Sequence, residues 1–344
     1  MKLAPISRAL LRALGIVVLA AVALGASVDL ASGATLRAAL RLRSDDSTAQ
    51  RVLPDGLERI KSGLVGAPFS SPLLGAGLTP DSIYGRSGKL RARIVSPRRG
   101  SIAIPLLSRL FGDSAVHGAG VYEVSDSTLG ASVNFITLVP FESKVKGMVG
   151  SYRIGYWPEE RGRLRSEAYE NPDGFIEVTP DNQDLQISEH FRLRDFLTHD
   201  QQDVWPKYLV LSEALVDKLE LVIQDLEAHG VRVERMRVMS GFRTPQYNQQ
   251  GVGRRGGRAK DSRHQFGDAA DVFVDNNGDG RMDDLNGDRR VDSKDARVIV
   301  AAVERVERAH PDLAGGGGIY RGTRAHGPFA HIDARGRRAR WGRS

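Results

Sequence analysis

The chain has 344 residues, a formal net charge of +7 and no cysteine. Its length predicts two folded units behind a leader. The missing thiol excludes disulfides, thiolate metal ligands, a cysteine nucleophile and the acylated cysteine of a lipoprotein, so any metal must bind histidine and carboxylate side chains.

Residues 1–33 predict a signal peptide or an uncleaved N-terminal anchor. Lys2, Arg8 and Arg12 precede an uncharged apolar run over 13–26 that ends in small residues. An exported basic protein meets an anionic cell envelope, and no basic stripe interleaved with aromatic residues suggests nucleic acid. We therefore expect a periplasmic or envelope protein with no nucleic-acid partner and with membrane contact only through this leader.

Three further segments follow the leader. Residues 34–85 have no sustained period and predict a linker with one short helix. Short runs over 86–160, such as "LRARIVS", "SIAIPLL" and "GVYEV", are separated by Gly, Ser and Pro and predict a small all-β module. Residues 165–344 predict an α+β domain with an antiparallel sheet and flanking helices.

The elements of this last region are distinct in the sequence. An apolar stripe from a Ser212 cap to Gly230 predicts a helix, and a second stripe predicts a helix over 293–309. The alternating "VRVERMRVM" and the apolar "AADVFV" predict strands. We expect "FAHIDAR" to form the last strand.

Polar residues flank "AADVFV" and recur near the C-terminus. His264 and Asp271 are ligand types that suit zinc, and Gly267 between them allows a tight turn. The segment "AHGPFAHID" offers a third ligand, His331. Asp333 shares its strand face, as a base or as a partner that orients it. From spacing alone, a surface histidine in a polar loop remains the alternative.

The stretch from Ser262 to Asp271 resembles the S-x-H-x-x-G-x-A-x-D signature of the LAS metallopeptidases, a family of zinc D-alanyl-D-alanine peptidases and hedgehog-like proteins. "SGFRTPQYN" is similar to a second family segment. "GGGGIYRGTRAHGPFAHIDARGRRARW" resembles the ending of YcbK-like murein endopeptidases. The resemblance covers about residues 185–342.

The resemblance implies a hedgehog/DD-peptidase-like fold with zinc on His264, Asp271 and His331 and a bound water as nucleophile. It implies that Arg243 holds a substrate carboxylate or polarises the scissile carbonyl, with a structural ion pair as the alternative. Several relatives place an acidic base three residues before the last ligand, where this chain has Pro328. The expected base is therefore Asp333, with His326 as second choice.

An acidic insert over 275–295 follows the strand that ends the signature. Its oxygen donors recur at alternate positions, as in two overlapping EF-hand-like calcium loops. We expect one calcium ion, with the second loop favoured because Asp295 closes it ahead of a helix. The second loop comprises Asp284, Asn286, Asp288, Asp292 and Asp295; the first comprises Asp275, Asn277, Asp279 and Asp283. A polar surface turn without metal is the alternative.

Together these features predict an exported zinc peptidase that hydrolyses an amide bond in peptidoglycan, with cleavage of cross-links favoured. Two alternatives stay open: a D,D-carboxypeptidase that removes terminal D-alanine, and a non-catalytic cell-wall-binding protein that retains zinc.

Overall fold

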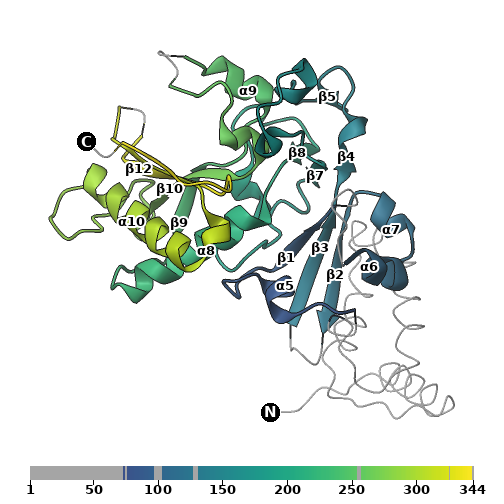
Figure 1. Cartoon of the computed structure of the whole chain (residues 1–344), viewed down its shortest axis with the longest axis horizontal. Helices are drawn as coiled ribbons and strands as arrows, with labels where there is room; N and C mark the ends of the chain where they lie inside the picture. Colours follow the sequence, from purple (N-terminus) through teal and green to yellow (C-terminus); the bar gives the residue numbers. More distant parts are fainter. Residues whose placement is uncertain are drawn as a thin grey trace, which may run out of the picture. The chain divides into compact units, whose positions relative to one another are not determined.

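The computed structural model describes Leu73 and residues 76–96, 103–126, 131–253, 257–324 and 326–342. The expected leader and most of the expected linker lie outside these residues. The described residues all belong to one compact unit, which mixes helices and sheets as the α+β class predicts (Figure 1). Within this part, no helix is both long and apolar enough to cross a membrane.

The first described sheet has three strands in the order β1-β3-β2, with β1 parallel and β2 antiparallel to β3. Two helices pack against it, and a short helix precedes it. These elements are α5 (Pro80–Tyr84), β1 (Ala92–Val95), α6 (Ala103–Phe111), α7 (Ser114–His117), β2 (Gly120–Asp126) and β3 (Ala131–Thr137).

The prediction of an all-β module over 86–160 is wrong at "SIAIPLL", most of which lies in α6. Ala103, Leu106 and Leu107 recur at the helical spacing of three and four residues and are buried on one side of α6. They share a core with Val133 and Phe135 of β3. The apolar run therefore covers the sheet as a helix and does not extend it.

Small elements connect this sheet to the C-terminal region. The strands are β4 (Val139–Pro140), β5 (Met148–Val149), β6 (Tyr152–Arg153), β7 (Gly174–Val178) and β8 (Lys207–Leu209). The short 3₁₀ helices of this connection are η2 (Phe141–Ser143), η3 (Glu159–Arg161), η4 (Glu167–Tyr169) and η5 (Leu193–Phe196); η6 (Arg263–Phe266) and η7 (Pro311–Leu313) lie within the C-terminal region. One core cluster holds Leu90, Trp157 and Val272, so no break between cores occurs at the expected boundary near 160.

The C-terminal sheet has the order β13-β11-β12-β10-β9 and carries α8 and α10 side by side across one face (Figure 1). Its pairs are antiparallel except for β11 and β13, which are parallel. The strand expected to be last is β12, and β13 follows it. The elements are α8 (Glu213–Ala228), β9 (Met236–Ser240), α9 (Pro245–Gln250), β10 (Ala269–Val274), α10 (Ser293–Ala309), β11 (Gly316–Tyr320), β12 (Phe329–Asp333) and β13 (Ala339–Trp341).

Both long helices begin and end where their sequence signals predict. Ser212 precedes α8, and Gly230, with φ +81°, follows it in the left-handed region that favours glycine. Asp292 and Asp295 form a reciprocal capping box at the start of α10. These caps confirm the two predicted helices.

A buried ion pair joins the two helices to the sheet. The Lys218 ammonium donates to Glu307 at 2.8 Å and to the carbonyl oxygen of Asp333 at 2.7 Å. The side chains of both Lys218 and Glu307 are 0% exposed. The pair thereby fixes α8 and α10 against the end of β12.

We expect Lys218→Ala to lower the free energy of unfolding by about 2–4 kcal/mol, because it removes a buried donor from the Asp333 carbonyl oxygen and leaves Glu307 with only its Arg338, Arg340 and Gly315 partners. Lys89→Ala is the matched control, since the Lys89–Glu189 pair is 34% and 40% exposed and is expected to contribute less than about 1 kcal/mol. Denaturant unfolding measures both changes. Equal effects of the two substitutions on the free energy of unfolding would contradict the stabilising role of the buried Lys218–Glu307 pair.

Candidate metal centre

Three side chains from separate elements meet beside the C-terminal sheet. His264 comes from η6, Asp271 from β10 and His331 from β12. Asp271 and His331 stand directly opposite each other in the antiparallel register. Gly267, with φ +69°, turns the chain from η6 towards β10, and a Cβ there would lie 2.2 Å from the Val210 carbonyl oxygen. The sequence prediction of a tight glycine turn is confirmed.

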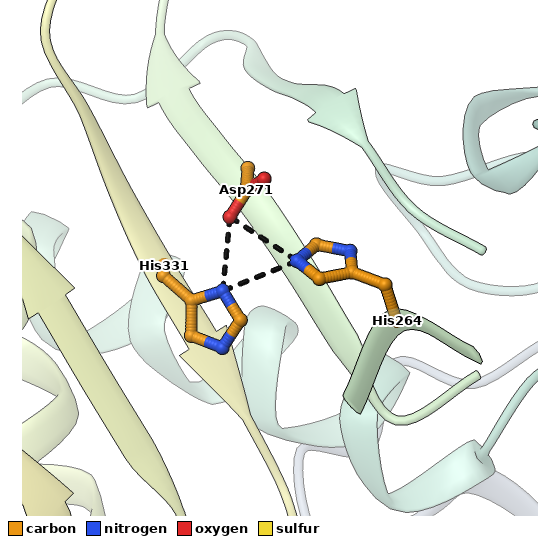
Figure 2. A group of neighbouring side chains, drawn as sticks. All are labelled: His264, Asp271 and His331. Carbon is orange, nitrogen blue, oxygen red and sulfur yellow. Dashed lines mark hydrogen bonds and ion pairs between the residues drawn. The ribbon is translucent and has the colours of Figure 1, made fainter. Parts of the chain in front are cut away.

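The three residues present one donor atom each to a common point (Figure 2). Asp271 Oδ1 lies 2.9 Å from His331 Nδ1 and 3.3 Å from His264 Nε2, and the two nitrogens are 3.2 Å apart. Ligands about 2.0–2.2 Å from a tetrahedral zinc ion lie roughly 3.3–3.5 Å from one another. The spacing of these donor atoms therefore fits one small metal ion with little movement.

Hydrogen bonds fix which nitrogen of each ring faces this point. His264 Nδ1 donates to the carbonyl oxygen of Gly241 at 2.7 Å, and His331 Nε2 donates to Asp333 Oδ2 at 3.1 Å. Both acceptors lack a proton to give, so the opposite nitrogen of each neutral ring keeps its lone pair. A second hydrogen bond of this kind is the usual way in which proteins orient a histidine ligand.

Arg243 fixes the carboxylate in the same manner. Its Nη2 donates to Asp271 Oδ2 at 2.6 Å, and its Nε donates to Ser240 Oγ at 2.8 Å. Asp271 consequently turns Oδ1 towards the histidines and keeps Oδ2 on the guanidinium. The structural ion pair considered for Arg243 is present.

The electrostatics of the trio favour a bound cation. Burial raises the pKa of Asp271, but contacts with His264 and His331 outweigh burial and hold this pKa well below its usual range. Burial lowers the pKa of His264. Burial opposes the charge on His331, yet its hydrogen bonds to Asp271 and Asp333 raise its pKa to about 9. A metal ion would take the place of the proton that His331 otherwise carries.

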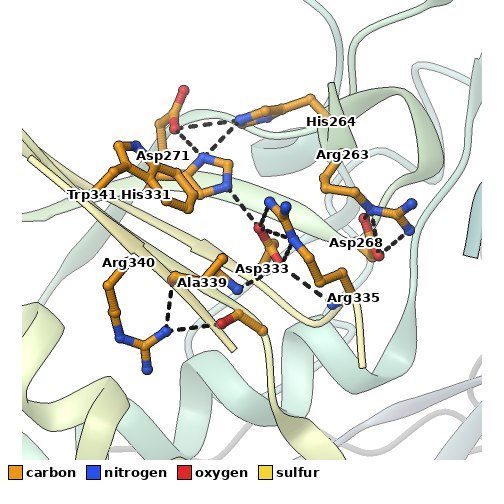
Figure 3. Close-up of polar contacts among 12 residues, drawn as sticks. Arg263, His264, Asp268, Asp271, His331, Asp333, Arg335, Ala339, Arg340 and Trp341 are labelled. Atoms are coloured by element: carbon orange, nitrogen blue, oxygen red, sulfur yellow. Dashed lines mark hydrogen bonds and ion pairs between the residues drawn. The ribbon is translucent and has the colours of Figure 1, made fainter. Parts of the chain in front are cut away.

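Asp333, the first-choice base, lies on the side of His331 that faces away from the convergent atoms (Figure 3). Its side chain is 0% exposed. Its Oδ1 accepts from Gly316 N at 2.7 Å and from Arg335 Nε at 2.8 Å, while Oδ2 accepts from His331. This geometry does not fit a base that reaches the open side of the centre. It fits the alternative expectation, a partner that orients His331.

Four consecutive glycines, Gly315 to Gly318, leave space for the side chains that surround His331. A Cβ at Gly316 would lie 2.2 Å from Asp333 Oδ2, and a Cβ at Gly318 would lie 2.3 Å from Trp341 Nε1. Gly318 pairs with His331, and the Trp341 ring lies 5.1 Å from the His331 ring (Figure 3). The three glycines at the start of β11 therefore let the Asp333 carboxylate and the Trp341 indole pack against His331.

An aromatic surface continues from the centre along the sheet. Tyr320 stacks on Phe329 with ring centroids 4.6 Å apart, and its hydroxyl accepts from Trp341 Nε1 at 2.9 Å. Burial raises the pKa of Tyr320 and the charge of Asp271 adds to this, while the hydrogen bond from Trp341 and the charge of Arg243 oppose the rise. The sequence analysis did not identify Tyr320 or Arg335 as site residues. The four glycines just before Ile319 and Tyr320 were the feature of the sequence that could have indicated a close approach of side chains there.

His326, the second-choice base, lies beside this surface. Its ring packs edge-on against Phe329 at 5.1 Å, and its Nδ1 donates to the Gly327 carbonyl oxygen at 2.8 Å. Phe329 and His331 alternate with Ala330 on β12, so they share one face of the sheet. No hydrogen bond or ion pair joins His326 to the trio within the described residues.

The oxygen donors of the two acidic loops mostly bond to backbone groups of their own loops. Nowhere else in the described residues do three histidine or acidic side chains converge as the trio does. In the favoured second loop, both oxygens of Asp295 accept backbone N–H groups, and Asp288 binds the Lys294 ammonium at 2.9 Å. In the first loop, one buried oxygen of Asp275 remains without a partner.

We expect Asp333→Ala to weaken zinc binding by about 10- to 100-fold, because His331 loses the acceptor that fixes its ring. Competition with a chromogenic chelator measures the affinity. Asp312→Ala, which removes a half-exposed carboxylate paired with Arg86, is the control. An unchanged zinc affinity in Asp333→Ala would contradict the orienting role.

Comparisons with known proteins do not assign a family or a function to this chain. No family model matches the chain, and no curated protein or solved structure matches it.

Proposed function

We propose that the chain is an exported zinc metallopeptidase of the LAS type that hydrolyses an amide bond in peptidoglycan stem peptides, with cross-links as the favoured substrate. The observation that carries the proposal is the buried trio of His264, Asp271 and His331, whose donor atoms have the spacing and the free lone pairs that zinc requires. Three protein ligands are typical of catalytic zinc, whereas structural zinc usually has four. The five-position signature from Ser262 to Asp271 supports the family.

Zinc in such a site supplies Lewis-acid chemistry: it polarises a carbonyl oxygen and makes water a stronger acid. Arg243 orients Asp271 through Nη2. Its Nη1 has no hydrogen-bond partner among the described residues and is the group left to bind a substrate carboxylate. Tyr320, 37% exposed, offers a hydroxyl proton, since its oxygen accepts from Trp341.

His326 is the better-supported proton acceptor. Its Nδ1 donates to Gly327, so Nε2 holds the lone pair and has no hydrogen-bond partner among the described residues. The ring packs on Phe329, which lies on the sheet face of His331. Asp333, by contrast, has both oxygens engaged by donors from three residues, Gly316, His331 and Arg335.

His326→Gln is expected to lower kcat by about 10²- to 10⁴-fold at unchanged zinc content, because the proton acceptor is lost while the metal ligands remain. Steady-state kinetics on a cross-linked muropeptide, with zinc measured in parallel, test this. His229→Gln, at a 52% exposed histidine after α8, serves as the control. An unchanged kcat in His326→Gln would show that His326 is not the proton acceptor.

His264→Ala is expected to lose zinc uptake and peptidoglycan hydrolysis together, because two protein ligands do not hold the ion. Purified sacculi are digested with the zinc-loaded protein and with the variant, and the products are identified by mass spectrometry. Cross-linked dimers converted to monomers with new amine termini support the proposal.

Other products would change the assignment in specific ways. Release of free D-alanine alone would replace the endopeptidase by a D,D-carboxypeptidase. Binding of sacculi by zinc-loaded protein without new termini would replace the enzyme by a cell-wall-binding protein.

A further inference from the structure

The acidic loop that follows β10 carries a feature that the zinc centre does not explain. Asp275 comes directly after Val274, the last residue of β10, and oxygen-bearing side chains follow at alternate positions. Gly280 has φ +80°, a conformation that an EF-hand loop requires at its sixth position. Counted from Asp275, this glycine occupies that position.

Hydrogen bonds within the loop hold it curled. Asp275 Oδ2 accepts from Gly280 N at 3.1 Å, and Asn277 Oδ1 accepts from Asp279 N at 2.8 Å. Asp279 Oδ1 accepts from Arg281 N at 2.8 Å. These bonds would form in a polar turn with or without a metal, so they do not by themselves indicate an ion.

The independent observation is the second oxygen of Asp275. The residue is 0% exposed, and its Oδ1 has no hydrogen-bond partner among the described residues. Its Oδ2 already accepts from Gly280 and from Arg237 Nη1 at 3.0 Å. A buried carboxylate oxygen without a donor is costly, and a cation that coordinates it removes the cost. Oδ1 is therefore the position where the loop lacks a ligand.

We propose that the loop from Asp275 to Asn286 binds one calcium ion, with Asp275 Oδ1 as its buried ligand. Asn277, Asp279 and the Arg281 carbonyl supply further oxygens, and Asp283 completes the set directly or through water. All donors are hard oxygens, which suit calcium and distinguish this site from the nitrogen-rich zinc centre. Within the described residues these donors do not converge as those of the trio do, so the proposal requires the loop to tighten around the ion.

The second loop, which the sequence analysis favoured, is the weaker candidate. Asp284 accepts from Gly287 N through Oδ1 and from Arg289 N through Oδ2, so both oxygens have donors. Asp295 uses both of its oxygens to cap α10 and the loop backbone. A lysine ammonium already neutralises Asp288. No buried oxygen in this loop lacks a partner.

Calcium in the first loop would stabilise the strand that carries a zinc ligand. Asp283 N donates to the Val274 carbonyl oxygen at 2.9 Å, and the neighbouring Met282 is buried in the core. The ion would thus join both ends of the loop to the end of β10 at Val274, three residues beyond Asp271. This inference does not rest on peptidase activity, because calcium binding is measurable in an inactive protein.

The test is calcium titration of the full chain after removal of divalent ions, by isothermal calorimetry, with thermal melting in calcium or in chelator. We expect one calcium ion per chain and a higher melting temperature in calcium. Asp275→Asn should weaken binding by at least about tenfold, because it removes a charged ligand. Asp284→Asn, the matched change in the second loop, should stay within about threefold.

Further variants distinguish a loss of calcium binding from misfolding of Asp275→Asn and from a failure of the proposed hydrolysis. Asp279→Ala, at an exposed position of the same loop, should also weaken calcium binding and covers the case in which Asp275→Asn does not fold. His264→Ala should bind calcium as the unaltered chain does, whatever becomes of hydrolysis. Absence of calcium binding would overturn the proposal, as would loss of binding in Asp284→Asn with retention in both first-loop variants.

Discussion

The candidate centre depends on two hydrogen bonds that join His264 and His331 to acceptors outside the trio of His264, Asp271 and His331. Gly241 accepts from Nδ1 of His264, and Asp333 accepts from Nε2 of His331. Each bond places the single proton of a neutral ring on the nitrogen that faces away from the trio, so the two inner nitrogens, which lie close to the Asp271 oxygen, are the ones that can coordinate a metal. Without these acceptors the same three residues would still be neighbours, but their tautomers and ring orientations would not be fixed.

The rest of the domain keeps these acceptors in place. Asp333 is held by Gly316 and Arg335, and its carbonyl oxygen accepts from the buried Lys218. Lys218 in turn binds Glu307, so α8, α10 and the sheet are joined through one buried polar network. Replacing a member of such a network removes a hydrogen bond from a buried partner, so we expect a change in α8 or α10 to reach Asp333 and, through it, His331.

Sequence patterns predicted the elements whose signals are local. Ser212, Gly230 and two apolar stripes placed α8 and α10, and the residue types and spacing of His264, Asp271 and His331 indicated a group that the structure brings together. Other features depend on tertiary partners that spacing does not reveal. "SIAIPLL" is largely helical because it packs on β3, and Asp333 orients His331 because Arg335 and Gly316 occupy its oxygens.

A crystal structure of the zinc-loaded protein, with anomalous data at the zinc edge, tests the central claim most directly. The account predicts one zinc ion bound by His264 Nε2, His331 Nδ1 and Asp271 Oδ1, with one further position open to solvent. It would be contradicted by a zinc ion elsewhere, or by His331 coordinating through Nε2, the nitrogen that here donates to Asp333.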